Sequence, residues 1–434
     1  MGRLISAISA RLADSGGLPA LRRRSDTTSI GANWRVGGHT ITAQSAWTNL
    51  RLKTFFDFDN TTGPIDFGVR YDERFQQFTQ ELRLASDESR RFSYLAGLFY
   101  LDQSLSYRSD FRFAPAPQDQ TLRTDVKTYS GFVQGMYKLT DAFALTAGGR
   151  LTKEIKRGAL TAIKNAGRAT TFGRVETTNF DWNVIAEYNV QPDVRLYATV
   201  SRGHKAPGFL NSVPGTAIVP PQLVLAGEKA TNYEAGLKAR FLGGRGRGNI
   251  ALYNMTVDDY QGSEYVPALL SFVTRNVDIR SRGVEGEIQF QFARDLQAGV
   301  SGAYNDGELR ASDNQMISAP RWNGTLNFRY TPALSADLRG SFSGLLNYTS
   351  KFPNQFDLQP GNFTPGRTLL DLRAGVRQES TGVELALIGR NVTNKRYVDF
   401  ASGYPFAPAN TVFLDQVARP RTIAIELKLP FGQR

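Results

Sequence analysis

Alternation of apolar and polar residues is the feature that most limits what this chain can fold into. In residues 423–431 every second side chain is apolar, and the residues between them include Glu426 and Lys428. A period of two predicts a β-strand whose two faces meet different media. The apolar face of such a strand packs either on a second sheet inside a protein or against the hydrocarbon of a membrane.

The same alternation recurs from about residue 27 to the end of the chain. The lengths of the connections between the strands indicate which of the two media the apolar faces meet. Short connections alternate with long ones, which is typical of an up-and-down membrane barrel and not of a Greek-key sandwich. The apolar faces often end in Trp, Tyr or Phe, as residues at a membrane interface do. Clear strand patterns lie at 180–190, 194–201, 321–330, 336–348 and 369–377, and predicted long connections at 105–121, 157–172 and 205–228.

The amino-acid composition excludes several classes of protein. The sequence has no run of 18 apolar residues, so it offers no transmembrane helix. It has no cysteine and only two histidines among 434 residues, which excludes disulfides and thiolate metal sites. No catalytic constellation is present, and we expect neither an enzyme nor a bound metal or cofactor. The net charge of +12 comes from arginines spread over the strands, so nucleic acid is not an expected partner.

Counting between the connections gives about 17 strands, each long enough to cross a bilayer when tilted. We therefore predict an all-β fold, an antiparallel up-and-down transmembrane β-barrel over residues 27–431, with residues 1–26 unassigned. The odd count means that the first and last strands run in the same direction. Barrels of single bacterial chains have even numbers of strands, so this sheet is expected to be incomplete or open.

Several stretches resemble the C-terminal barrel of the TonB-dependent outer-membrane receptors. They follow one another in the order expected for that family, and together they are specific. The stretches are LYATVSRGHKAPGFLN (196–211), ATNYEAGLKARF (230–241), NVDIRSRGVEGEIQFQF (276–292), LIGRNVTNKRY (387–397) and ARPRTIAIELKLPF (418–431).

The resemblance implies a barrel of 22 strands in the outer membrane of a Gram-negative bacterium. It implies uptake of a scarce ligand, such as an iron–siderophore complex, with energy from the TonB system. The implied surroundings are outer-membrane lipid and lipopolysaccharide. In that family a signal peptide, a TonB-contacting box and a plug domain precede the barrel. None of them is visible in this sequence, so the chain is expected to be a truncated form that does not transport by itself.

Arginines on the polar faces of the strands are the first candidate site. A basic lumen wall would attract an anionic ligand. The alternative is that these arginines balance wall acids such as Glu187, Glu384 and Glu426, or hold a plug. The candidates are Arg150, Arg195, Arg329, Arg339, Arg373 and Arg390.

Residues of the long connections are the second candidate site, because rings stack on siderophores and sugars. The alternative is that the same side chains only anchor the loops, and for His204 a structural role is favoured over a metal ligand. The candidates are His204, Phe111, Phe113, Phe352, Phe356, Phe363, Tyr404 and Phe406.

Two other functions stay open at this point. A passive porin-like channel would have the same strand pattern and would conduct ions without TonB. A soluble basic β-protein that binds polyanions would place the apolar faces inside a sandwich and would need no detergent.

Overall fold

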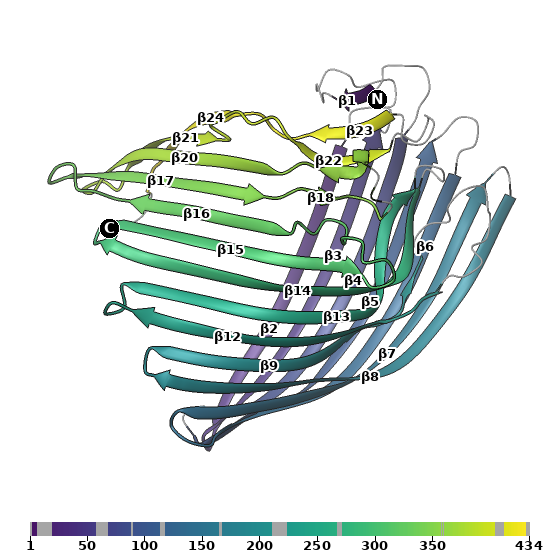
Figure 1. The fold of residues 1–434 in the computed structure, drawn as a ribbon. Helices are drawn as coiled ribbons and strands as arrows, with labels where there is room; N and C mark the ends of the chain where they lie inside the picture. Colours follow the sequence, from purple (N-terminus) through teal and green to yellow (C-terminus); the bar gives the residue numbers. More distant parts are fainter. Residues whose placement is uncertain are drawn as a thin grey trace.

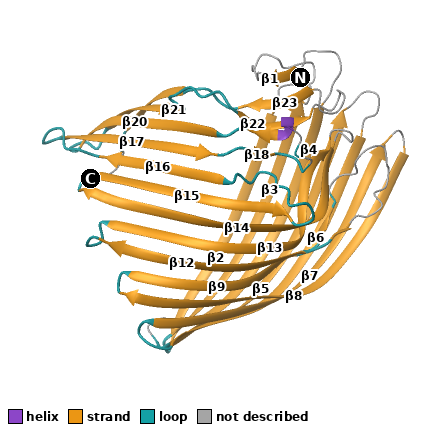
Figure 2. Ribbon diagram, in the orientation of Figure 1, coloured by secondary structure: helices purple, strands orange, loops and turns teal. Residues whose placement is uncertain are grey.

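The computed structural model describes residues 2–6, 20–57, 68–87, 90–112, 118–164, 167–210, 224–266, 271–356, 358, 360–403 and 412–430. Within them the secondary structure is strand, apart from one short 3-10 helix at Pro360–Asn362 (Figure 2). No helix of the described residues is long and apolar enough to cross a membrane.

Seventeen strands of the described chain form one antiparallel sheet, in agreement with the count from the sequence. Each strand pairs with the next one in the series. The strands are β2 (Ala20–Val36), β3 (His39–Asp57), β4 (Gly68–Ser86), β5 (Phe92–Arg112), β6 (Gln118–Lys138), β7 (Phe143–Lys164), β8 (Gly167–Gln191), β9 (Val194–Lys205), β12 (Glu228–Phe241), β13 (Gly246–Val266), β14 (Ser271–Ala293), β15 (Leu296–Leu309), β16 (Trp322–Tyr330), β17 (Leu338–Thr349), β20 (Arg367–Gln378), β21 (Glu384–Arg390) and β24 (Thr422–Lys428).

The sheet is strongly curled, and its first strands lie behind its last ones in Figure 1. β2 pairs only with β3, and β24 pairs only with β21. Among the described residues no pairing joins β2 to β24, so the two strands form the edges of an open barrel. They run in the same direction, which agrees with the expectation of an odd and unclosed sheet.

Short strands lie outside this sheet, near the end where the long connections gather (Figure 1). They form one sheet of three strands and two pairs. The three-stranded sheet contains β1 (Gly2–Ser6), β22 (Val398–Gly403) and β23 (Val412–Val417), and the pairs are β10 (Gly208–Phe209) with β11 (Val224–Leu225) and β18 (Phe352–Pro353) with β19 (Phe363–Thr364).

The connections predicted at 105–121 and 157–172 are wrong, because most of each is strand. β7 and β8 stay paired until Lys164 lies opposite Gly167. Thr161 and Thr170 face each other across this extension, and their hydroxyl oxygens lie 2.9 Å apart. The apolar alternation ends here because both faces of the extension stand above the hydrocarbon, although the backbone ladder continues.

The outward face of the sheet is apolar over a band of constant height. In β24 the side chains of Ile423, Ile425 and Leu427 are 66%, 76% and 59% exposed on the outer surface. Aromatic residues mark the two borders of the band, in outward-facing pairs eight residues apart. These pairs are Phe92 with Tyr100, Tyr129 with Tyr137, and Phe180 with Tyr188.

Eight residues span about 27 Å along a strand and about 20 Å along the membrane normal once the strand tilts, which is close to the apolar band of about 25 Å in membrane barrels. At the border nearer the long connections the rings contact one another across four strands. Trp47 lies 6.4 Å from Phe78, and Tyr100 lies 5.2 Å from Tyr129, measured between ring centroids. These four residues form the upper aromatic girdle, and it fixes the level of the membrane interface.

Candidate functional site

The inner face of the sheet carries the polar residues that alternate with the outward apolar ones. All six candidate arginines lie in strands, on this face. Four of them lie on the consecutive strands β16, β17, β20 and β21, and the other two lie apart from these on β7 and β9. Their surroundings differ, and these differences divide the six into paired and unpaired groups.

Arg373 is the most constrained of the six. Its guanidinium donates to Glu384 Oε1 at 2.7 Å and to Glu426 Oε1 at 2.8 Å. It also donates to the Ser341 hydroxyl, and Lys428 Nζ lies 3.3 Å from Glu426. The Arg373 and Glu384 side chains are only 20% and 14% exposed. Arg373 of β20 therefore ties together β17, β21 and β24 through ionic hydrogen bonds at the inner wall.

Arg195 and Arg150 are also held by neighbours. Arg195 donates to Glu187 Oε1 at 3.0 Å and to Asn189 Oδ1 at 3.0 Å. Arg150 lies over the rings of Phe99 and Phe132, with its guanidinium carbon 5.2 and 5.6 Å from the ring centroids. Both cations are thus fixed at the wall, one by a carboxylate and one by aromatic faces.

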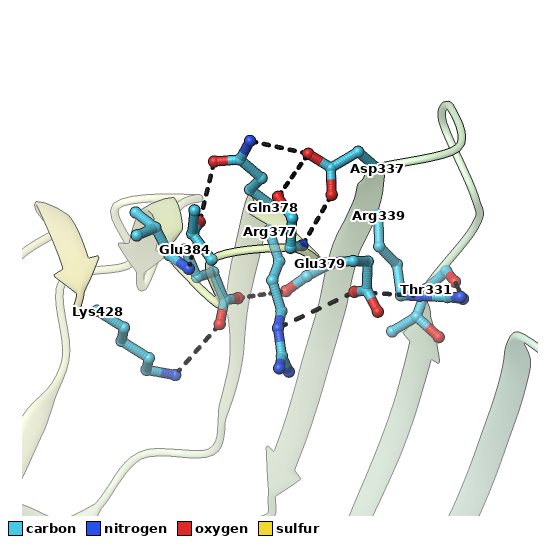
Figure 3. Close-up of polar contacts among 12 residues, drawn as sticks. Thr331, Asp337, Arg339, Arg377, Gln378, Glu379, Glu384 and Lys428 are labelled. Carbon is cyan, nitrogen blue, oxygen red and sulfur yellow. Dashed lines mark hydrogen bonds and ion pairs between the residues drawn. The ribbon is translucent and has the colours of Figure 1, made fainter. Parts of the chain in front are cut away.

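Arg339 lies beside the short turn between β16 and β17 (Figure 3). Its guanidinium donates to the Thr331 carbonyl at 3.1 Å and lies 3.5 Å from Glu379. In the same turn Asp337 accepts hydrogen bonds from Gln378 Nε2 at 2.8 Å and from the Ser380 amide at 2.7 Å. These donors hold the pKa of Asp337 below its ordinary value of 3.8.

We expect the Asp337→Ala variant to lose a stabilising contact only where the carboxylate is ionised. Because the folded-state pKa is depressed, the contribution is present above the unfolded-state pKa and disappears as pH falls through the folded-state pKa. Urea unfolding of both proteins should show a constant difference at neutral pH that shrinks below about pH 4. A difference that is independent of pH would contradict this assignment.

Arg329 and Arg390 form the unpaired group. Both side chains are exposed on the inner face, and within the described residues neither makes an ion pair or a side-chain hydrogen bond. Arg329 lies opposite Gln297 and Ser343, and Arg390 lies opposite Thr422. Their charge is therefore available to an anion in the lumen.

The candidate residues of the predicted long connections lie in different surroundings. The Phe356 ring is 5% exposed and packs in a cluster with Val257, Ile279 and Leu309. Phe363 lies under Lys351, whose Nζ is 4.1 Å from the ring centroid. Phe352 is half-buried in the β18–β19 pair.

His204 lies near the end of β9 and contacts the neighbouring strand. Its Nδ1 is 2.7 Å from Asp181 Oδ1. Phe113, Tyr404 and Phe406 lie outside the described residues, as does the side chain of Phe111. No group of three potential metal-ligating side chains is assembled within the described part of the chain.

Tyr197 and Lys238 on the inner face were not among the residues predicted from the sequence. The Tyr197 hydroxyl donates to Glu234 Oε1 at 2.7 Å, and Lys238 Nζ lies 5.2 Å from the Tyr197 ring centroid. The alternation could have identified Tyr197, because it is two residues from Arg195 on the same strand face. The partners could not be identified, since they depend on register between strands.

Comparison with known proteins gives one family. Residues 7–394 match the family model described as TonB dependent receptor-like, beta-barrel. The match covers most of the chain and all but the last strand, β24, of the large sheet.

Solved structures with the same fold are receptors and transporters. The ferric yersiniabactin uptake receptor FyuA from Yersinia pestis superposes with a TM-score of 0.83 at 19% identity, over 97% of this chain and 63% of that one. The ferric citrate transporter FecA gives a TM-score of 0.71 at 15% identity, over 95% and 62%. The copper transporter OprC gives 0.73 at 16% identity, over 96% and 67%. The chain thus spans less than two thirds of the first two proteins.

Proposed function

Since the chain belongs to the TonB dependent receptor-like β-barrel family, we propose that it is the barrel of an importer for a scarce anionic ligand, an iron–siderophore complex. Barrels of this family lie in the outer membrane of Gram-negative bacteria, and the family consists of transporters rather than enzymes. The observation that carries the proposal is the family match over a wide, open sheet whose inner wall bears unpaired arginines. The energy source would be the TonB system of the inner membrane.

The ligand class rests on the charge of the wall and on the names of similar proteins. Those names include ferric yersiniabactin, ferric citrate and copper. A ferric complex with carboxylate or catecholate oxygens is anionic, and Arg329 and Arg390 present uncompensated positive charge. A free copper cation would be repelled by the same wall, so the iron complex is favoured.

The experiment is uptake of radioactive iron by cells that lack their own siderophore receptors and express the gene for this protein. Ferric citrate and a ferric catecholate serve as substrates, in strains with and without TonB. We expect accumulation of iron that disappears without TonB. Accumulation that persists without TonB would show the passive channel instead, and steady conductance of the purified protein in planar bilayers would support that reading.

The two unpaired arginines give a sharper prediction. In the Arg329→Gln, Arg390→Gln variant we expect the Kd for an anionic ferric complex to rise about a hundredfold, because each of the two lost charge-assisted contacts costs about 1.5 kcal/mol. Titration of the purified protein in detergent measures the Kd. Arg202→Gln is the control, since Arg202 is exposed on the opposite face of β9, in register with Trp182. Equal losses in both variants would contradict a ligand in the lumen.

A further inference from the structure

Aromatic rings gather on the outward face of β12 and β14, at the end of the sheet opposite the long connections (Figure 1). The Phe241 ring lies nearly parallel to the Phe290 ring, with the two centroids 6.3 Å apart. Phe292 meets Phe290 edge to face, with centroids 4.6 Å apart. Gly246 of β13 allows this approach, because a Cβ atom there would lie 2.1 Å from the Phe241 ring. These three phenylalanines are called the lower aromatic cluster.

The strand register places the lower aromatic cluster at a border of the apolar band. Trp322 and Tyr330 of β16 are a further outward pair eight residues apart, and Tyr330 marks the border nearer the short turns. Leu296 lies opposite both Tyr330 and Ala293, so Phe292 stands near the level of Tyr330. Short turns face the periplasm in membrane barrels of this kind, and aromatic girdles lie at the interface. The cluster therefore lies at the headgroup level of the periplasmic leaflet.

Arg245 lies against this cluster. It ends the turn between β12 and β13, and its guanidinium carbon lies 5.8 Å from the Phe290 ring centroid. The turn has a left-handed backbone at Leu242, Gly243 and Gly244, with φ angles of 54°, 66° and 82°. The Arg245 side chain is exposed, and within the described residues it makes no ion pair and no hydrogen bond. The ring thus orients the guanidinium while its N–H donors stay available to another partner.

Arg91, in the turn between β4 and β5, shows the contrasting case. Its guanidinium carbon lies 5.3 Å from the ring centroid of Tyr137, at the same border of the band. Unlike Arg245, it donates to two backbone carbonyls, those of Lys138 and Leu139, each at 3.1 Å. Stacking on a ring at this border therefore does not by itself leave an arginine available to a ligand, and Arg91 serves as a matched control.

A second cation lies in the adjacent turn, between β14 and β15. Gln291 joins the two turns, because its backbone amide donates to the Arg245 carbonyl at 2.8 Å and its side chain donates to the Arg294 carbonyl at 3.4 Å. The Arg294 side chain is exposed, and neither it nor the adjacent Asp295 makes an ion pair in the part of the chain that the structure describes. The two turns carry two arginines and one acid, so their net charge is positive.

We propose that the lower aromatic cluster, with Arg245 and Arg294, binds an anionic phospholipid of the periplasmic leaflet, of the phosphatidylglycerol class. The phosphodiester carries a negative charge that the glycerol headgroup does not offset, and guanidinium groups bind such oxygens in bidentate geometry. The acyl chains would lie along the apolar band, against the rings. A zwitterionic headgroup would bring its ammonium toward the two arginines, which repel it. The site requires the membrane placement of the sheet and does not depend on transport or on the identity of the imported ligand.

The test compares two charge-matched variants of the full chain in detergent. Arg245→Gln with Arg294→Gln removes both cations of the proposed site, and Arg90→Gln with Arg91→Gln removes two from the turn between β4 and β5. Titration calorimetry with dioctanoyl phosphatidylglycerol measures the Kd after circular dichroism has verified the fold. We expect the first variant to raise the Kd at least tenfold and the second to leave it within twofold. Equal changes in the two variants, or no change in the first, would overturn the site.

A second arm uses the original protein to identify the occupant. Dioctanoyl phosphatidylethanolamine has the same phosphodiester with an added ammonium, and we expect it to bind at least fivefold more weakly. Glycerol phosphate carries the anion without acyl chains, and it should not compete at the concentration of the lipid. Equal binding of the ethanolamine lipid would overturn the anionic headgroup. Competition by glycerol phosphate at that concentration would overturn a membrane lipid as the occupant.

Discussion

Replacing Arg373 by alanine should lower the free energy of unfolding by about 3 kcal/mol, the largest effect that we expect from removing one inner-wall side chain. The variant leaves Glu384 and Glu426 without the guanidinium that now binds both. Glu384 is 14% exposed, so water cannot fully replace the lost partner. Lys428 lies 3.7 Å from Glu384 and compensates only in part.

Urea unfolding of the protein in lipid vesicles, followed by tryptophan fluorescence, measures this effect. Arg329→Ala is the matched control, because Arg329 lies in the same cross-strand row, two strands away, and makes no ion pair in the described structure. The control should change the unfolding free energy by less than about 0.5 kcal/mol. If both variants lose the same free energy of unfolding, the assignment of Arg373 as the residue that links β17, β21 and β24 is wrong.

Placing arginine at Val300 should cost about 2–4 kcal/mol, which is the penalty for a charged side chain at the centre of the lipid band. Val300 is 49% exposed on the outer surface of β15, midway between Leu296 and Tyr304. Arginine at Ser301 should be close to neutral, because Ser301 faces the lumen opposite Glu287. The two positions are adjacent, so they have the same depth and differ only in the face of the strand.

Both variants are compared by the same vesicle unfolding measurement. A penalty at Val300 with none at Ser301 assigns lipid to one face and water to the other. A larger penalty at Ser301 would mean that the polar face is packed inside a protein, as in a sandwich.

The fold was largely predictable from the sequence, because alternation directly reports which residues share a face. The residues from Ile423 to Leu427 show this, since their apolar members lie on the outer surface as expected. Strand ends were less predictable. At 157–172 the chain leaves the hydrocarbon and loses its apolar alternation while its backbone pairing continues.

The site was predictable only at the level of residue type and face. Alternation placed Arg373 on the inner wall, but its partner Glu426 is 53 residues away, and only strand register brings the two together.

The four tryptophans can show whether the outward face of this sheet meets lipid. Register places all of them on the outward face: Trp34, Trp47, Trp182 and Trp322. The measurement is quenching of their fluorescence in vesicles of phosphatidylcholine with brominated acyl chains, compared with quenching by aqueous iodide. We expect strong quenching by the brominated lipid and weak quenching by iodide. Strong quenching by iodide with none by the lipid would contradict the membrane barrel.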